Sequence, residues 1–458
     1  MTKREWLARN RALFFPAIST ALISEAAKAQ WAHIPPAVLS PAAMNYLDPA
    51  APWHYPFTLF SAGQANPKTM NAPKPDIVMA RDRNATIVLG DSGGYQIASG
   101  AAGFEYTDDT PPLMLNWLEH MADWSMGLDF PTGTDNNGRI DKWVDQLNAD
   151  GVDLASMARA SGLSEGYHAC LTMTLTNNDR FVAERVPGKT RLLNVLQGRN
   201  HAESKHWYEA VKHYPFEGWA FAASHQSRPS MVVARLLDMH HDGILKNVGW
   251  LHVLGTAKLE MGCVLSAIQQ EVRKLGCPEF QISYDAASAT TAAVNDQIVL
   301  GHTISSHGWT TQTIPAKKLF KQFPGDTRPL NTVLDEVLQD RMDGDARRRG
   351  LADTIVSQRL TLADLDPKGL GRMSAQYLGI LHNTQALVQA HTDVQDNFFE
   401  ETPFVYDPLL SPVSVSAKVE GVRQLFAMPN GAATARVWGR GWLDDWPKPN
   451  TAKKLAAA

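Results

Sequence analysis

Short apolar runs alternate with longer amphipathic stretches over the first two thirds of the chain. Glycine, asparagine or other polar turn residues bound each run, and several runs are too continuously apolar for a sheet with one face in water. The pattern therefore predicts strands that are buried on both faces. They are expected at 57–60, 76–79, 86–89, 125–129, 192–197, 218–222, 250–254 and 280–285.

Amphipathic helices are predicted between these strands. Four apolar residues fall on one face of 113–124, and 257–275 has a helical period that Gly276 would end. Strands that alternate with helices form a parallel sheet with crossover connections. Six to eight strands over about 300 residues favour an α/β fold, a TIM-type (β/α)8 barrel over 1–310. An open doubly wound sheet is the structural alternative.

The pattern changes near residue 311, where strand-like runs disappear. Helical periods take their place at 329–343, 345–362 and 371–391. The proline-rich segment 401–415 is expected to be a loop. We therefore predict a mainly helical C-terminal appendage over 311–453, and we interpret the final residues 454–458 as a remnant of cloning.

The composition is that of a globular protein, with 44% hydrophobic and 20% charged residues. No apolar run is long enough to span a membrane, and the N-terminus lacks the pattern of a signal peptide. Cys170, Cys263 and Cys277 are too far apart and too few for a disulfide framework, so we expect a cytoplasmic protein. The net charge of −4 does not indicate a nucleic-acid binder, although a local basic patch beside one cleft would suffice.

The string GDSGGYQ occupies 90–96, directly after the predicted strand 86–89. GDSGG also surrounds the nucleophile of trypsin-like serine proteases, but those enzymes place a catalytic histidine early in the chain, beside a cysteine. Only His33 and His54 precede Ser92 here, neither beside a cysteine, and the surrounding pattern is α/β. A glycine turn that merely ends a strand is the second alternative.

Side chains at the carboxyl ends of barrel strands face the substrate. Asp91 holds such a position, the two glycines that follow let the backbone approach a planar ligand, and Tyr95 offers a ring for stacking. Asp129 and Asp285 also follow predicted strands. A single aspartate there is often a helix N-cap. Three at one barrel mouth would bind a metal, or would divide the acid, base and nucleophile roles at a glycosidic carbon.

The segment 91–96 resembles the DSGG-aromatic-Gln signature of the tRNA-guanine transglycosylase superfamily. Further segments follow in the order of that family and cover roughly 80–290, with alanine in place of a family glycine at one of them. They are Leu196-Gln197-Gly198, Gly218–Ala223, His252–Gly255 and Tyr284-Asp285. The resemblance implies a TIM-barrel enzyme that exchanges a base in a nucleic acid.

By this resemblance, Asp285 would attack the anomeric carbon of a guanosine nucleotide and expel guanine. Asp91 would protonate the leaving base and then deprotonate the incoming one. The nucleotide would be single-stranded or flipped out of its stack. The residues that contact the base would be Ser92, Tyr95, Asp129, Gln197, the backbone of Ala222 and Ala223, and Leu254 as an apolar wall.

Two departures from the family favour DNA over tRNA as the substrate. The tRNA enzymes carry a zinc site of three cysteines and a histidine after the nucleophile, whereas no cysteine follows Asp285 here, and His302 and His307 alone make a poor site. We therefore expect no zinc and no other cofactor. The stretch AASATT replaces the family's Cys and L-P-T-R, with no positive charge before Lys317. Both changes resemble the 7-deazaguanine DNA transglycosylases of phages and bacteria, whose substrates would be DNA and a 7-deazaguanine base.

Contacts with the nucleic acid must then come from basic residues elsewhere. Arg81 and Arg83 precede the Asp91 strand, and Arg199 follows Gln197. Arg347, Arg348 and Arg349 form a basic run on a predicted helix, where a solvated face is the alternative. A homodimer fits the same family. A tRNA transglycosylase with a zinc-free surface, and a non-catalytic superfamily member that binds nucleic acid, are the alternative functions.

Overall fold

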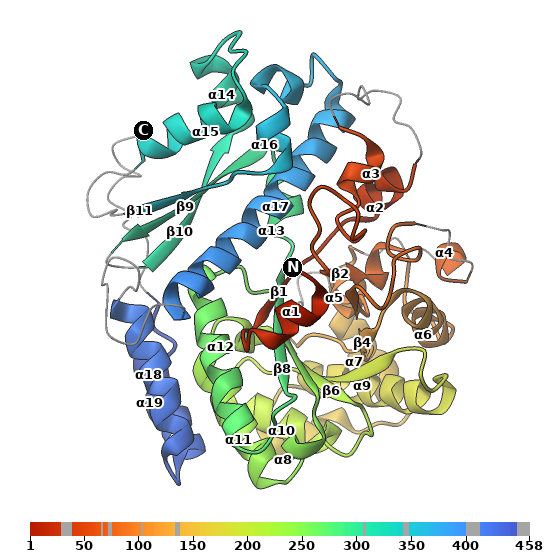
Figure 1. The fold of residues 1–458 in the computed structure, drawn as a ribbon. Helices are drawn as coiled ribbons and strands as arrows, with labels where there is room; N and C mark the ends of the chain where they lie inside the picture. The colour runs from red at the N-terminus through yellow and green to blue at the C-terminus, as the bar shows by residue number, and fades with distance from the viewer. Residues whose placement is uncertain are drawn as a thin grey trace.

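The computed structural model describes the chain except for residues 29–38, 66, 72–75, 102–103, 133–137, 306–307, 342–347, 400–412 and 447–458. Parallel strands stand at its centre: β1 (Leu13–Pro16), β2 (Phe57–Ser61), β3 (Ile87–Asp91), β4 (Trp124–Met126), β5 (Arg191–Leu196), β6 (Gly218–Phe221), β7 (Trp250–Val253) and β8 (Gln281–Ala286). They form one eight-stranded sheet in the order β1-β8-β7-β6-β5-β4-β3-β2. A parallel bridge between Ala17 and Leu59 joins the edge strands, so the sheet nearly closes into a TIM-type barrel (Figure 1).

Helices surround the barrel on its outside, and polar caps set several of their boundaries. The side chain of Ser164 accepts the N–H of Tyr167 at the start of α9, and Gly276 follows α12 in the left-handed conformation with φ 93°. The helices up to β8 are α1 (Lys3–Ala8), α2 (Thr20–Ala26), α3 (Pro41–Met44), α4 (Pro67–Asn71), α5 (Gly94–Ser99), α6 (Thr110–Met121), α7 (Arg139–Ala149), α8 (Leu154–Ser161), α9 (Glu165–Glu184), α10 (His201–Val211), α11 (Pro229–His241) and α12 (Leu259–Lys274).

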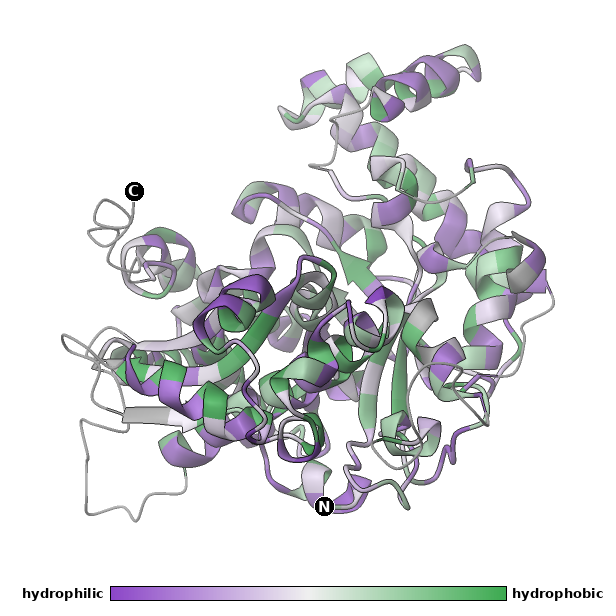
Figure 2. Cartoon of the chain, turned by 90° about the horizontal axis from the view of Figure 1, so that it is seen from above, coloured by the Kyte–Doolittle hydropathy of each residue, from purple (hydrophilic) through white to green (hydrophobic). Residues whose placement is uncertain are grey.

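Large aromatic side chains pack inside the barrel, where Phe57, Trp124 and Trp250 each begin a strand and Phe15 lies near the end of β1. The rings of Phe15 and Phe57 lie 5.1 Å apart, and those of Trp124 and Trp250 lie 5.4 Å apart. Hydrophobic residues concentrate on the central strands and on the helix faces turned toward them, while polar residues mark the outside (Figure 2). This packing makes the barrel a filled core rather than a channel.

A small antiparallel sheet follows the barrel. It consists of β9 (Gln297–Ser305), β10 (Gly308–Pro315) and β11 (Arg348–Leu351), in the order β10-β9-β11. Residue 310, where we expected the barrel domain to end, therefore lies inside β10. The short helices of this region are α13 (Ser288–Val294), α14 (Ala316–Gln322), α15 (Leu330–Gln339) and α16 (Ile355–Arg359).

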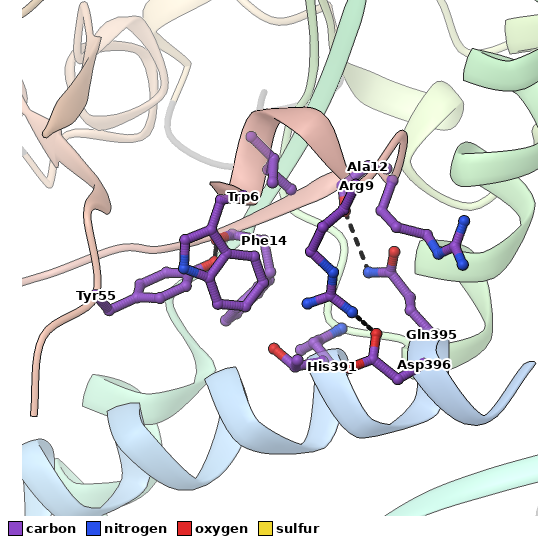
Figure 3. A pocket seen from close by; sticks show the side chains of 11 residues that line it. Trp6, Arg9, Ala12, Phe14, Tyr55, His391, Gln395 and Asp396 are labelled. Carbon is purple, nitrogen blue, oxygen red and sulfur yellow. Dashed lines mark hydrogen bonds and ion pairs between the residues drawn. The ribbon is translucent and has the colours of Figure 1, made fainter. Parts of the chain in front are cut away.

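The long helix α17 (Arg372–Phe399) covers the outer faces of β8 and β1 (Figure 1). Its His391 stacks on Phe14 of β1, with ring centroids 4.0 Å apart, and its ring Nδ1 lies 3.0 Å from the hydroxyl of Tyr284 in β8. Gln395 donates to the carbonyl oxygen of Ala12, and Arg9 pairs with Asp396 (Figure 3). A helix from the C-terminal region thus supplies part of the barrel's outer layer.

The last two helices, α18 (Val413–Ala427) and α19 (Gly431–Trp442), pack against α12 and α11. Asp444 accepts the N–H of Ser230 at 3.0 Å and its hydroxyl at 2.6 Å. Gly439 lies so close to α11 that a β-carbon there would come within 2.3 Å of the Ser230 β-carbon. None of the helices in the described ranges is long and apolar enough to cross a membrane.

Two sequence-based predictions of local structure are wrong, and one strand was missed. Segment 76–79 is a turn, because the Asp76 carboxylate accepts the N–H groups of Val78 and Met79, both at 2.8 Å. Segment 345–362 holds β11 and α16 rather than one helix. Strand β1 was not predicted, because Pro16 interrupts its apolar run. Proline is tolerated where a strand ends, and Pro16 is the last residue of β1.

Candidate functional site

Two glycines after β3 bring three loops together at the carboxyl end of the barrel. Gly93 has φ 81°, and a β-carbon there would lie 2.4 Å from the backbone nitrogen of Gly63 in the loop after β2. A β-carbon at Gly94 would lie 1.7 Å from the carbonyl oxygen of Asp129 in the loop after β4. Neither position can therefore carry a side chain if Asp91 and Asp129 are to lie side by side. The double glycine has this structural role whatever the site binds.

Asp91, the last residue of β3, is poised to carry a proton. One of its carboxylate oxygens accepts the N–H of Gly93 at 3.1 Å. Burial raises the pKa of Asp91, and the negative charge of Asp285 raises it further; hydrogen bonds from Ser61 and Gly93 oppose the shift. Asp91 and Asp285 both lie at the carboxyl ends of strands in the same parallel sheet, β3 and β8.

Asp129 lies in the loop after β4 and is 9% exposed. Its Oδ2 accepts the side-chain N–H of Gln197, which follows β5, at 2.6 Å. Burial raises the pKa of Asp129 to about 7; the Gln197 bond opposes this shift and the charge of Asp91 adds to it. These surroundings favour the protonated form of the Asp129 carboxyl group more than water does.

Two buried polar atoms beside these aspartates have no hydrogen-bond partner in the described part of the chain. They are Oγ of Ser92 and Oε1 of Gln197, whose residues are 1% and 3% exposed. A buried polar atom without a partner costs free energy, so such atoms are uncommon and mark places that a ligand or water fills. Within the described residues no histidine bonds to Ser92 Oγ, unlike the arrangement around the nucleophile of a serine-protease triad.

Asp285 lies near the carboxyl end of β8 and is 7% exposed. Its Oδ1 accepts the backbone N–H of Gly255 at 2.7 Å and lies 3.1 Å from Nε2 of His252 in β7. Among the residues that the structure describes, Oδ2 makes no hydrogen bond. One oxygen of this carboxylate is thus held, and the other is available to a ligand.

His252 lies at this site beside Asp285, and the sequence analysis did not single it out. It is fully buried and faces the barrel interior between Asp285 and Ser283. The sequence could have identified it, because a polar residue two positions after Trp250 lies on the same face of an otherwise apolar strand. A polar side chain at an inward position near the end of a barrel strand is suited to the site.

The remaining residues predicted to contact a base lie on neighbouring segments. Tyr95 is on α5 and is 59% exposed, so its ring is available at the surface. Ala222 is 7% exposed, and Leu254 is half-buried after β7. Ala223 has φ 52°, a conformation that costs a non-glycine residue roughly 1 kcal/mol. This strain falls where the family signature carries a glycine.

The basic residues predicted to contact nucleic acid are not gathered at this site. Arg81 has a fully buried side chain paired with Asp123 at 2.8 Å, and Arg83 pairs with the same carboxylate at 3.3 Å. Asp123 directly precedes β4, so both arginines lie at the amino end of the barrel, opposite the three aspartates. This placement lends no support to the nucleic-acid role predicted for these two arginines, which stays a prediction.

The structure also gives little support to the other basic residues predicted to contact nucleic acid. Arg199 lies at the carboxyl end but forms a two-pronged ion pair with Glu203, at 2.7 Å for the closest pair of atoms. Arg348 and Arg349 belong to strand β11 and not to a helix, so that part of the prediction is wrong. Arg347 lies outside the described residues.

Metal binding by the protein's own side chains is the next property of the site. No group of three or more histidine, cysteine, aspartate or glutamate side chains there could hold a metal ion. Cys170, Cys263 and Cys277 are buried free thiols, and His302 is a buried residue of β9; His307 lies outside the described residues. The sequence after Asp285 contains no cysteine, so it does not offer the donors of a thiolate zinc site.

No protein-family model matches the chain, and no curated protein matches it. The finding that stands is the fold, a TIM-type α/β barrel followed by C-terminal helices. Because one barrel fold supports many chemistries, the function must be argued from the site itself.

Proposed function

We propose that this protein is a base-exchange transglycosylase that replaces guanine in DNA by a 7-deazaguanine derivative. The observation that carries the proposal is that Asp91 and Asp285 both stand at the carboxyl ends of parallel strands of one barrel, β3 and β8. Asp91 has a raised pKa, as a proton donor requires, whereas Asp285 offers an oxygen that makes no hydrogen bond within the described residues. Two carboxyl groups in such different surroundings suit the roles of acid and nucleophile.

The proposed reaction has two balanced steps. Oδ2 of Asp285 bonds to C1′ of the target nucleotide as the bond from C1′ to N9 of guanine breaks, and Asp91 gives its proton to the leaving guanine. The incoming base then loses its N9 proton to Asp91, bonds to C1′ and releases Asp285. The protein returns to its first state, so the exchange consumes no ATP and needs no oxidant.

Recognition of the base is assigned to Asp129, Gln197 and Ser92. Guanine and 7-deazaguanines share a ring N–H and an exocyclic amino group, which are donors suited to the Asp129 carboxylate. The unpartnered oxygens of Ser92 and Gln197 are two further groups for the edge of the base. The exposed Tyr95 would stack on the ring once the nucleotide has left its helix.

DNA is proposed over tRNA because the segment after Asp285 contains only small, uncharged residues. Ala286 is buried, and α13 begins at Ser288, so no basic side chain stands there to read an RNA loop. A deoxyribose presents no 2′-hydroxyl and needs no polar partner at that position.

The test supplies labelled guanine and a labelled 7-deazaguanine base with single-stranded DNA, duplex DNA and tRNA in competition, without ATP. We expect label in DNA, and a covalent protein–DNA adduct that survives denaturation. Asp285→Asn should lower adduct formation by at least about 10³-fold because the nucleophile is gone. Asp150→Asn, at an exposed residue just after α7, is the matched control and should behave as the wild type.

Each other outcome changes the proposal in a defined way. Preferential labelling of tRNA would overturn the choice of DNA. Full adduct formation by Asp285→Asn would remove Asp285 from its role. Absence of both label and adduct with every nucleic acid would refute base exchange and favour a protein that only binds nucleic acid.

A further inference from the structure

A chain of hydrogen bonds runs through the barrel interior and ends on Asp285. Nε1 of Trp250 donates to Oγ of Ser283 at 2.7 Å, and the same Oγ lies 2.8 Å from Nδ1 of His252. Nε2 of His252 lies 3.1 Å from Oδ1 of Asp285. His252 and Ser283 are directly paired in the register of β7 with β8, so the neighbouring strands set this geometry.

The direction of each hydrogen bond follows from the donors at the two ends. An indole N–H can only donate, so Trp250 occupies one lone pair of Ser283 Oγ. An ionised carboxylate can only accept, so Nε2 of His252 must carry a proton to bond with Asp285. In the neutral ring Nδ1 is then an acceptor, and the Ser283 hydroxyl donates to it. Every donor in this series of hydrogen bonds therefore points toward the carboxylate of Asp285.

A second donor reaches the same oxygen from the turn after β7. Gly255 has φ 72°, and its N–H lies 2.7 Å from Oδ1 of Asp285. A β-carbon at Gly255 would come within 2.9 Å of Oε1 of Gln226, so side chains are disfavoured there on two grounds. Two donors on one oxygen fix the rotation of the carboxyl group and leave Oδ2 as the outward oxygen.

We propose that His252 is a positioning residue that holds Asp285 by Oδ1 and so selects Oδ2 as the attacking oxygen. This inference rests on the proposed function for the identity of the reaction, but the placement of Asp285 does not depend on it. His252 itself touches no substrate, because its ring is fully buried behind Asp285 and contacts Phe15 edge to face at 6.3 Å. Its effect must therefore appear in the rate of bond formation and not in the binding of the nucleic acid.

The kinetic test compares three variants by single-turnover adduct formation and by DNA affinity. His252→Phe keeps the ring volume but loses the donor, and should slow adduct formation about 100-fold with DNA affinity unchanged. His252→Gln can place an amide N–H where Nε2 stood and should restore the rate to within about tenfold of the wild type. His391→Phe makes the same exchange on the outer face of β8 and should leave the rate unchanged.

Thermal unfolding of all three variants is measured as a control, so that the rates are compared between folded proteins. A His252→Phe variant that forms the adduct as fast as the wild type would overturn the positioning role. So would a His252→Gln variant that is as slow as His252→Phe, because the donor would then not be what matters.

A spectroscopic test separates this inference from the proposed function. Nitrogen-15 spectra of histidine-labelled protein, with His252→Gln to identify the signals, should show the proton of His252 on Nε2. A ring protonated only on Nδ1 would overturn the inference, since Nε2 could not donate to Asp285. Wild-type protein that exchanges no base but carries the Nε2 proton would refute the proposed function while it supports the placement of Asp285.

Discussion

The amino half of the barrel interior is filled by aromatic and aliphatic side chains, whereas its carboxyl end gathers three aspartates. The same strands supply both regions. Inward positions on β7 change from Trp250 to His252, and on β3 from Ile87 to Asp91, within one strand length. The apolar half stabilises the fold by burial, while the polar end carries carboxyl groups at a cost in free energy. The apolar half thus stabilises the arrangement of the strands, and this arrangement fixes where the aspartates lie at the carboxyl end.

The largest expected effect in this comparison comes from Asp129. Burial raises the pKa of the Asp129 carboxyl group from near 4 in the unfolded protein to about 7 in the folded protein. The folded protein therefore loses stability as the pH rises through this range, because the buried group must ionise. Asp129→Asn removes that loss and should raise the free energy of unfolding by up to roughly 4 kcal/mol at pH 8, and by little at pH 4.

Denaturant unfolding of the wild type and of Asp129→Asn at both pH values checks this prediction. The same variant should lose affinity for the incoming base, so stability and function change in opposite directions. Equal stability of the two proteins at pH 8 would show that the buried carboxyl group carries no such cost.

Phe57→Ala, in the apolar half, should have the opposite profile. Phe57 is fully buried and its ring lies 5.1 Å from that of Phe15, so truncation leaves a cavity and should cost about 3 kcal/mol of stability. Base exchange by the folded protein at low temperature should change less than about twofold, because no site residue loses a partner. Calorimetric unfolding and single-turnover rates measure both; a large loss of rate without loss of stability would contradict the division of the barrel into two regions.

The smallest expected effect is a pH dependence of base binding. In the proposed function the base is bound by the ionised form of Asp129, whose pKa burial raises to about 7. Affinity for the 7-deazaguanine base should therefore fall about tenfold for each pH unit below 7 and be constant above it. Titration calorimetry from pH 5.5 to 8 measures this slope, and Asp129→Asn, which cannot ionise, should show a flat profile.

The alternation of apolar runs with amphipathic stretches was sufficient to predict the barrel. Seven of the eight strands fall on predicted runs, because strands buried on both faces leave a continuous apolar signal. The hairpin and sheet after β8 were not predicted, nor was the position of α17 on β8 and β1. Those arrangements depend on contacts between residues far apart in the chain, such as Gln395 with the Ala12 carbonyl, and local periodicity carries no trace of them.

For the site, strand-end position and the double glycine were enough to select Asp91, Asp129 and Asp285 from the sequence. Only the tertiary structure decided that Gly93 and Gly94 are required by neighbouring loops, that Arg81 and Arg83 lie at the amino end of the barrel, and that His252 holds Asp285. The physical reason is that a motif fixes which residue types stand at a strand end. Burial, pairing and the direction of each hydrogen bond are set by the other strands that close around it.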